Sequence, residues 1–250
     1  MTTHSRPLEN KTALITGASK RIGKAIALYL ASLGANILVH YHTSKEEAKR
    51  VVGTLSDQSV KAWALQSDLA DPESASQLIG KARTVAGDLH YLINNASIFP
   101  NSQLDSFSSQ ELEHVMQVNA MAPLQLCRDF AKLKTAEHII NLLDTRITAF
   151  DFSHAAYDLS KKTLHQLTQS LAIELAPQIR VNAVAPGLIL PPADKDHSYL
   201  EKLKHTNPLQ TYGTPEEIAR AIGFLITSHF IQGHVIFVDG GRHLKGIQRG

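Results

Sequence analysis

Tyr157 and Lys161 are two residues capable of proton chemistry, and they lie four positions apart in a segment with helical periodicity, residues 155–176. This spacing places both side chains on one face of a helix. A lysine ammonium beside a phenol lowers the pKa of the phenol, which lets it donate a proton near neutral pH. The pair therefore predicts an acid–base centre, although the same spacing also occurs in ordinary exposed helix pairs.

A glycine-containing segment, residues 16–23, reads Thr-Gly-Ala-Ser-Lys-Arg-Ile-Gly and separates a predicted strand from a predicted helix. Gly17 would let the chain turn sharply off the strand, and Gly23 would let the helix pack close to the sheet. The helix N-terminus would offer its N–H groups to the pyrophosphate of a dinucleotide. The expected cofactor-binding residues here are Gly17, Ser19, Lys20, Arg21 and Ile22. A plain turn is the alternative interpretation.

The basic residues of this segment indicate which dinucleotide would bind. Arg21 stands where such segments often have a glycine, and with Lys20 it would bring positive charge to the bound phosphates. A site for NAD(H) places an acidic residue about 20 positions further on. The residues at that place here are His40, Tyr41, His42, Thr43 and Ser44. Histidines and hydroxyls suit a 2′-phosphate that a carboxylate would repel, so the sequence predicts NADP(H), with a polar strand end of no function as the alternative.

Two shorter signals follow the third and fourth predicted strands. Asp68 and Leu69 would contact the adenine, and Asn95 and Ala96 would line the nicotinamide ribose. Amides are common in turns, so only the position of these residues after successive strands favours a binding role.

Short apolar or β-branched runs predict seven strands, at residues 13–15, 36–41, 60–65, 91–93, 138–143, 180–184 and 234–238. Helical spacing predicts helices at residues 22–33, 45–55, 72–86, 109–133, 155–176 and 215–226. Because strands and helices alternate, we expect an α/β protein with a single-domain Rossmann fold, in which helices cover both faces of a seven-stranded parallel sheet. Ligands would then bind beyond the carboxyl ends of the strands.

Residues 187–213 interrupt the alternation. They contain Pro191, Pro192 and Pro208 and are too long for an ordinary connection in a compact domain. We expect a substrate lid within this segment, with a simple surface excursion as the alternative. Residues 1–250 as a whole are expected to form one NADP(H)-binding and catalytic domain.

The composition excludes several classes of function. With 25 basic and 23 acidic residues the net charge is +2, so neither nucleic acid nor an anionic membrane is an expected partner. Cys127 is the only cysteine and is expected in the core, and the thirteen histidines show no metal-ligand spacing, so no metal is expected. The first ten residues lack the apolar region of a secretory signal, and no apolar stretch approaches the roughly 20 residues of a membrane span. These features predict a cytoplasmic protein.

Five short sequence features occur in order along the chain. They are residues 16–23, Asn94-Asn95-Ala96, Asn119, Tyr157-x-x-x-Lys161 and Pro186-Gly187. In this pattern the chain resembles the short-chain dehydrogenase/reductases. The resemblance implies that Tyr157 donates a proton, that Lys161 binds ribose and depresses the pKa of Tyr157, and that Asn119 holds a water in a proton relay. Pro186, Gly187 and Leu188 would border the nicotinamide.

The same resemblance implies a homotetramer, in which a neighbour's C-terminal tail, with Arg242 and His243, approaches the site.

One position departs from the pattern of that family. Its catalytic serine lies thirteen residues before the tyrosine, where this chain has Asp144. A carboxylate donates a hydrogen bond only when it is protonated, so it cannot replace a hydroxyl at a ketone oxygen. It can pair with a ring that carries a protonatable nitrogen or an amine. The alternative is an alignment shifted by one residue, in which Thr145 supplies the hydroxyl.

The chain resembles the pteridine reductases and dihydromonapterin reductases in Asp144, Arg21, His40-Tyr41-His42-x-Ser44 and Asn95-Ala96-Ser97-x-Phe99. The C-terminal Asp-Gly-Gly-Arg-His-Leu, residues 239–244, strengthens this resemblance. It implies that the pterin lies between the nicotinamide and the ring of Phe99, and that Ser97 and Arg21 contact the cofactor phosphate and the pterin. Simple loop packing is the alternative role for Phe99.

The sequence therefore leads to the hypothesis that NADPH reduces a 7,8-dihydropterin to the tetrahydropterin, with dihydrofolate as a further candidate substrate. Hydride would reach C6, and N5 would take its proton from Tyr157 or, through water, from Asp144. With Lys161 these groups would titrate as one coupled unit. The alternatives are an NADPH-dependent carbonyl reductase and a non-catalytic nucleotide-sensing protein.

Overall fold

The computed structural model describes residues 6–192 and 195–244. They form one parallel sheet with the strand order β3-β2-β1-β4-β5-β6-β7. Its strands are β1 (Thr12–Ile15), β2 (Asn36–Tyr41), β3 (Ala62–Gln66), β4 (Tyr91–Asn94), β5 (His138–Leu142), β6 (Arg180–Pro186) and β7 (Val235–Val238). This confirms the predicted fold class. Because the chain leaves β3 to return beside β1, the order reverses between β1 and β4, where open α/β sheets bind ligands.

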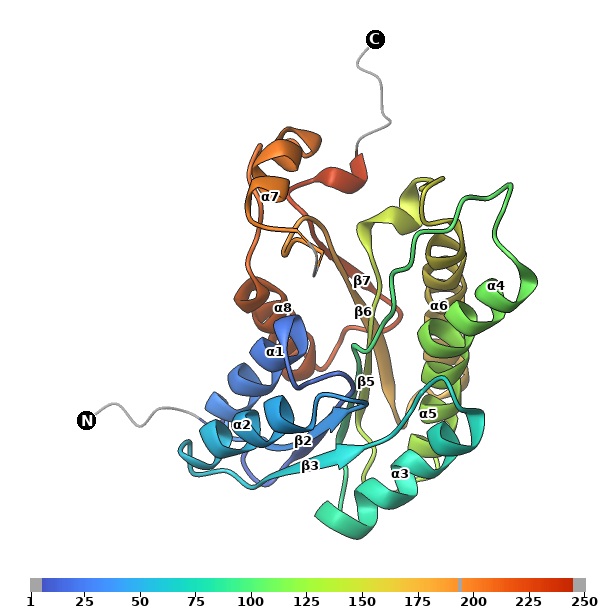
Figure 1. The fold of residues 1–250 in the computed structure, drawn as a ribbon. Coiled ribbons are helices and arrows are strands. Elements are labelled where there is room, and N and C mark those ends of the chain that lie inside the picture. Colours follow the sequence, from blue (N-terminus) through green and yellow to red (C-terminus); the bar gives the residue numbers. More distant parts are fainter. Residues whose placement is uncertain (1–5, 193–194, 245–250) are drawn as a thin grey trace.

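Helices cover both faces of the sheet (Figure 1). The helices are α1 (Arg21–Ser32), α2 (Lys45–Ser56), α3 (Pro72–Ala86), α4 (Ser109–Met116), α5 (Ala122–Phe130), α6 (Ala155–Glu174), α7 (Ser198–Leu203) and α8 (Pro215–Thr227). Alternate residues of β1 serve the two layers, since Ala13 and Ile15 pack with α1, α2 and α8, whereas Leu14 packs with α3, α5 and α6.

The predicted helix over residues 109–133 is wrong in one respect, because it is interrupted. A π-helical segment, η1 (Gln117–Met121), separates α4 from α5. Pro123 follows this segment and has no N–H to continue the α-helical pattern. Such π segments are frequent at functional sites, and this one contains the predicted site residue Asn119.

Residues 187–213 carry the short helix α7 and the 3-10 segment η3 (Lys204–Thr206), neither of which the sequence pattern predicted. Their role as a lid stays a prediction. Two further 3-10 segments, η2 (Thr145–Thr148) and η4 (Arg242–Leu244), lie after β5 and β7. In the part of the chain that the structure describes, no helix is long and apolar enough to cross a membrane.

We expect replacement of Phe130 by alanine to lower the free energy of unfolding by about 3–5 kcal/mol, because the ring is fully buried between α5 and the sheet. Phe230→Ala is the matched control, since the ring of Phe230 is fully exposed. Urea denaturation measures both. Equal losses for the two variants would contradict this account of the core.

Candidate active site

A cavity of about 570 Å³ opens where the strand order reverses. Its lining includes most of the predicted cofactor-binding residues: Gly17, Ser19, Lys20, Arg21, Ile22, His40, Tyr41, His42, Thr43, Ser44, Asp68, Leu69, Asn95, Ala96 and Ser97. Ala70, Ile98, His114 and Val118 also line it, although the sequence analysis did not single them out. The last two belong to α4 and η1, and only the packing of these segments brings them to the cavity.

The glycines of the first loop are required by close approaches. Gly17 has φ +63°, and a Cβ there would lie 3.1 Å from the Cα of Ala96. A Cβ at Gly23 would collide with the carbonyl oxygen of Gly17. No side chain caps the N-terminus of α1, so its first N–H groups suit a pyrophosphate. The loop therefore fits the dinucleotide that the sequence predicted.

Arg21 takes a backbone conformation that explains why glycine is common at its position. Its φ is +55°, in the left-handed region that favours glycine. Its guanidinium Nη2 donates a hydrogen bond to the carbonyl oxygen of Pro191 at 2.6 Å. Arg21 thus links the cofactor loop to residues 187–213 as well as bringing positive charge to the cavity.

Two predicted cofactor residues hold the loop in place. His40 Nδ1 accepts from the N–H of Gly17 at 3.1 Å, and Nε2 lies 3.1 Å from the carbonyl oxygen of Ser67. Burial lowers the pKa of His40 to about 4, so the ring is neutral and neither nitrogen is left for a phosphate. Asn95 Nδ2 donates to the carbonyl oxygens of Thr16 and Gly17 at 2.8 and 3.2 Å. Both side chains therefore position the loop, and the predicted contact of Asn95 with the nicotinamide ribose stays a prediction, since Asn95 also lines the cavity.

Other residues of the cavity lining carry groups suited to the additional phosphate of NADP(H). Lys20 is exposed, and Thr43 and Ser44 contribute hydroxyls to the lining. His42 Nε2 lies 3.5 Å from Asp68 Oδ2 and its side chain is half exposed. Asp68 also accepts from the N–H of a neighbouring loop residue, so it is partly committed to its own turn.

Asp144 and Tyr157 meet at the carboxyl end of β5. The Tyr157 hydroxyl donates to Asp144 Oδ2 at 2.9 Å, and the N–H of Arg146 donates to Asp144 Oδ1 at 2.8 Å. Thr145 is buried, and its hydroxyl donates to Asp239 Oδ2 at 2.6 Å. Asp144 therefore faces the phenol, and the alternative alignment that gave this place to Thr145 is wrong.

Tyr157 is a weaker acid than the sequence analysis predicted. Burial, followed by the charge of Asp144 and their hydrogen bond, raises the pKa of Tyr157 well above its ordinary value. Lys161 does not offset this, because its Nζ donates to the carbonyl oxygen of Leu142 at 2.7 Å and lies 5.7 Å from the centre of the phenol ring. Burial lowers the pKa of Lys161 to about 8. The phenol thus keeps its proton and shares it with the carboxylate.

Asn119 uses its whole side chain to fix neighbouring segments. Its Oδ1 accepts from the Ile98 N–H at 2.9 Å and from the Ser97 hydroxyl at 3.1 Å. Its Nδ2 donates to the Ile98 carbonyl oxygen at 2.9 Å and to the Ser160 hydroxyl at 3.1 Å. An amide makes four such bonds, so this side chain has no capacity left to hold the expected water.

Phe99 lies beside the phenol. Its ring edge meets Tyr157 with centroids 4.6 Å apart, and it stacks on His154 at 3.9 Å. The Arg146 guanidinium carbon lies 5.0 Å from its centroid. Phe99 is 37% exposed, so both the predicted stacking role and loop packing are compatible with its contacts.

Pro186 is the last residue of β6, and Gly187 and Leu188 follow it. All three lie outside the lining of the large cavity. A Cβ at Gly187 would lie 2.5 Å from the Cβ of Asp239, so this glycine allows the C-terminal segment to pack closely. Leu188 is buried and lines a smaller cavity of about 90 Å³. Their predicted contacts with the nicotinamide stay predictions.

Comparison with known proteins shows which family this chain is similar to. Residues 17–243 match the family described as enoyl-(acyl carrier protein) reductase. A short-chain type dehydrogenase/reductase of Picea abies is 30% identical and aligns over 94% of this chain and 93% of its own length. The chain belongs to the short-chain dehydrogenase/reductase family. The 3-oxoacyl-(acyl-carrier-protein) reductase FabG of Staphylococcus aureus is 33% identical, over 94% of this chain and 98% of that protein.

Solved structures of short-chain dehydrogenase/reductases superpose on nearly the whole chain. FolM alternative dihydrofolate reductase 1 from Brucella canis, complexed with NADP, is 31% identical with a TM-score of 0.89, covering 96% of this chain and 97% of that one. A short-chain dehydrogenase from Burkholderia cenocepacia, also in complex with NADP, is 32% identical with a TM-score of 0.87, covering 94% and 98%.

Substitution of His40 tests how this reductase holds its cofactor loop. Because burial lowers the pKa of His40 to about 4, the unfolded chain takes up a proton below about pH 6.5 while the folded chain does not. This residue's contribution is therefore present at pH 7 and lost as the pH falls toward 4. Between pH 7 and pH 5 we expect His40 to account for a loss of about 2 kcal/mol in the free energy of unfolding.

Urea denaturation at the two pH values checks this expectation. His40→Gln should lose less stability than the unsubstituted protein over that interval, whereas the control His229→Gln, at an exposed position, should behave as the unsubstituted protein does. An unchanged pH dependence in His40→Gln would show that the histidine takes up its proton freely in the folded state.

Proposed function

We propose that this protein reduces a 7,8-dihydropterin to the tetrahydropterin at the expense of NADPH. The observation that carries the proposal is the hydrogen bond of 2.9 Å from Tyr157 to the Asp144 carboxylate. A ring nitrogen becomes basic as the neighbouring carbon is reduced, so an acid pair beside it stabilises the transition state more than the ground state. A ketone oxygen needs only hydroxyl donors. The FolM name of the Brucella canis neighbour supports the same substrate class.

The cofactor in this proposal is NADP(H). The uncapped N-terminus of α1, the close-packed glycines and the basic residues Lys20 and Arg21 suit its phosphates. Related structures were solved with NADP bound. When bound, the reduced nicotinamide supplies the hydride that goes to C6 of the pterin.

The proton for N5 comes from the pair formed by Tyr157 and Asp144, which titrates as one unit. Tyr157 is only 7% exposed, whereas the side chain of Asp144 is 19% exposed. Asp144 is therefore the more accessible member of the pair. The buried ammonium of Lys161 would hold a ribose hydroxyl beside the phenol.

A panel of NADPH oxidation assays tests the substrate class. We expect turnover with dihydromonapterin, dihydrobiopterin or dihydrofolate, and a loss of at least about 100-fold in kcat/KM for Asp144→Ser because the acid pair is broken. Binding of NADPH, measured by fluorescence titration, should be unchanged. Asp144→Asn is the matched variant, since it keeps the shape of the side chain and removes its charge.

The FabG relatives favour the competing function, reduction of a ketone. Turnover of simple ketones without turnover of any dihydropterin would establish that function and overturn ours. Full dihydropterin turnover in Asp144→Ser would remove this residue from the mechanism. If NADPH binds, no substrate is reduced and Tyr157→Phe leaves the biological role intact, a sensing role is favoured.

Cofactor choice is tested at Thr43, which lines the cavity. Thr43→Asp should lower the ratio of kcat/KM for NADPH over NADH by about tenfold, because a carboxylate repels the 2′-phosphate. Thr43→Asn is the neutral control of similar size and should keep the ratio. An unchanged ratio in Thr43→Asp would place the 2′-phosphate elsewhere.

A further inference from the structure

The C-terminal segment η4 is fixed against η2, the turn that carries the reacting carboxylate. The hydroxyl of Thr145 donates to Asp239 at 2.6 Å, and the hydroxyl of Thr148 donates to the carbonyl oxygen of His243 at 3.4 Å. These contacts hold the residues on either side of Arg242. They bring Arg242 to the turn that contains Arg146, immediately beside the candidate active site.

Arg146 already shares two carboxylates with other groups. Its Nε lies 3.0 Å from Asp151 Oδ2, which also contacts His154 Nδ1 at 3.0 Å. Its Nη1 lies 3.6 Å from Asp144 Oδ2, which accepts the hydroxyl of Tyr157. Asp151 therefore already contacts Arg146 and His154, and Asp144 already contacts Arg146 and the Tyr157 hydroxyl.

Arg242 has no such carboxylate partner in the part of the chain that the structure describes. Among residues 6–192 and 195–244, its guanidinium makes no hydrogen bond and no ion pair, although the residue is partly buried. Burial and the positive charge of Arg146 lower the pKa of Arg242, an effect that the charges of Asp144, Tyr199 and Asp239 oppose. A partly buried cation without a partner is costly. Arg146 and Arg242 lie on segments that contact each other, and two guanidinium groups on such segments make a favourable site for one anion, because each can form charge-assisted hydrogen bonds with it.

We propose that Arg242 and Arg146 bind an anionic group, a carboxylate or a phosphate, at the end of the substrate's side chain. This inference rests on the proposed function, since the side chain of a pterin is attached to C6, next to the nitrogen that faces Tyr157 and Asp144. The Arg146 guanidinium lies 5.0 Å from the centre of the Phe99 ring. An anionic side chain that leaves the reacting ring along Phe99 thus reaches the two arginines.

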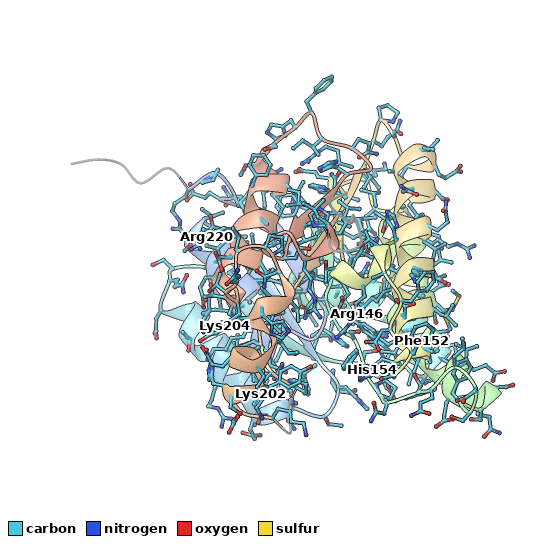
Figure 2. The ribbon with its side chains drawn as sticks, turned by 90° about the horizontal axis from the view of Figure 1, so that it is seen from above. Arg146, Phe152, His154, Lys202, Lys204 and Arg220 are labelled. Carbon is cyan, nitrogen blue, oxygen red and sulfur yellow. The ribbon has the colours of Figure 1, made fainter. Side chains whose placement is uncertain are left out.

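Two lysines lie on the side of the molecule opposite to Arg146 and His154 (Figure 2). Figure 2 shows Arg146 and His154 beside Phe152 on one side, and Lys202 and Lys204 on the other. Both lysines are exposed, and Lys204 pairs with a neighbouring glutamate at 2.7 Å. The charge of Lys204 is therefore partly balanced by Glu201.

A matched pair of substrates tests the inference: 7,8-dihydroneopterin, whose side chain is neutral, and its 3′-phosphate. Dihydrobiopterin and dihydrofolate form a second pair in which the anion is a carboxylate, so the two pairs distinguish the two sources of charge. The measured quantity is kcat/KM for the anionic substrate divided by that for its neutral partner. We expect Arg242→Gln to lower this ratio by about 10- to 100-fold, and Arg242→Lys to restore part of it.

Arg220→Gln is the matched control, because it removes the same charge from α8, away from Arg146 (Figure 2). It should leave the ratio unchanged. Raising the ionic strength should weaken the preference of the unsubstituted protein for the anionic substrates. Thermal unfolding of each variant verifies that the fold is retained.

The possible failures are distinguishable. If both members of each pair are reduced equally well, or if Arg242→Gln impairs both to the same extent, the anion site is overturned while the pterin function stands. If no dihydropterin is reduced, the proposed function fails. Calorimetric titration of the NADP⁺ complex with dihydroneopterin and its 3′-phosphate then decides the anion site alone: tighter binding of the phosphate that is lost in Arg242→Gln supports it, and equal binding overturns it.

Discussion

The hydrogen bond between Tyr157 and Asp144 is the contact on which the rest of the site depends. It joins the end of β5 to the start of α6, so the sheet and the helix layer must be in register for the two groups to meet. The carboxylate is held from behind by the N–H of Arg146, and the turn that carries it is anchored to Asp239 through Thr145. The geometry of one proton-sharing pair is therefore determined by segments almost a hundred residues apart.

The same bond separates this chain from the general pattern of its family. A phenol that gives its hydrogen bond to a carboxylate is a weaker acid than a phenol beside a hydroxyl, because ionisation would place two negative charges together. Tyr157 and Asp144 consequently share one proton. Chemistry at a nitrogen that demands a proton late in the reaction is compatible with such a pair, since the acid is used only when a base has been formed.

Much of the fold and of the candidate site could be predicted from the sequence. The alternation of apolar strands and amphipathic helices predicts the sheet, because the periodicities differ, and the position of Gly17 and Gly23 after the first strand predicts the cofactor end. Asp144 was identifiable from its spacing to Tyr157. What the sequence did not predict is how polar side chains divide their hydrogen bonds. His40 and Asn119 carry the right chemistry for ligands, yet both are saturated by protein groups, and only the folded backbone shows it.

The contact between Arg21 and the carbonyl oxygen of Pro191 connects the two halves of the site thermodynamically. The guanidinium gives one of its five N–H donors to Pro191, so the others stay available to a ligand in the cavity. A ligand that leaves the bond intact meets a segment already held against the cofactor loop. A ligand that displaced the Arg21 side chain would therefore also act on the segment that carries Pro191.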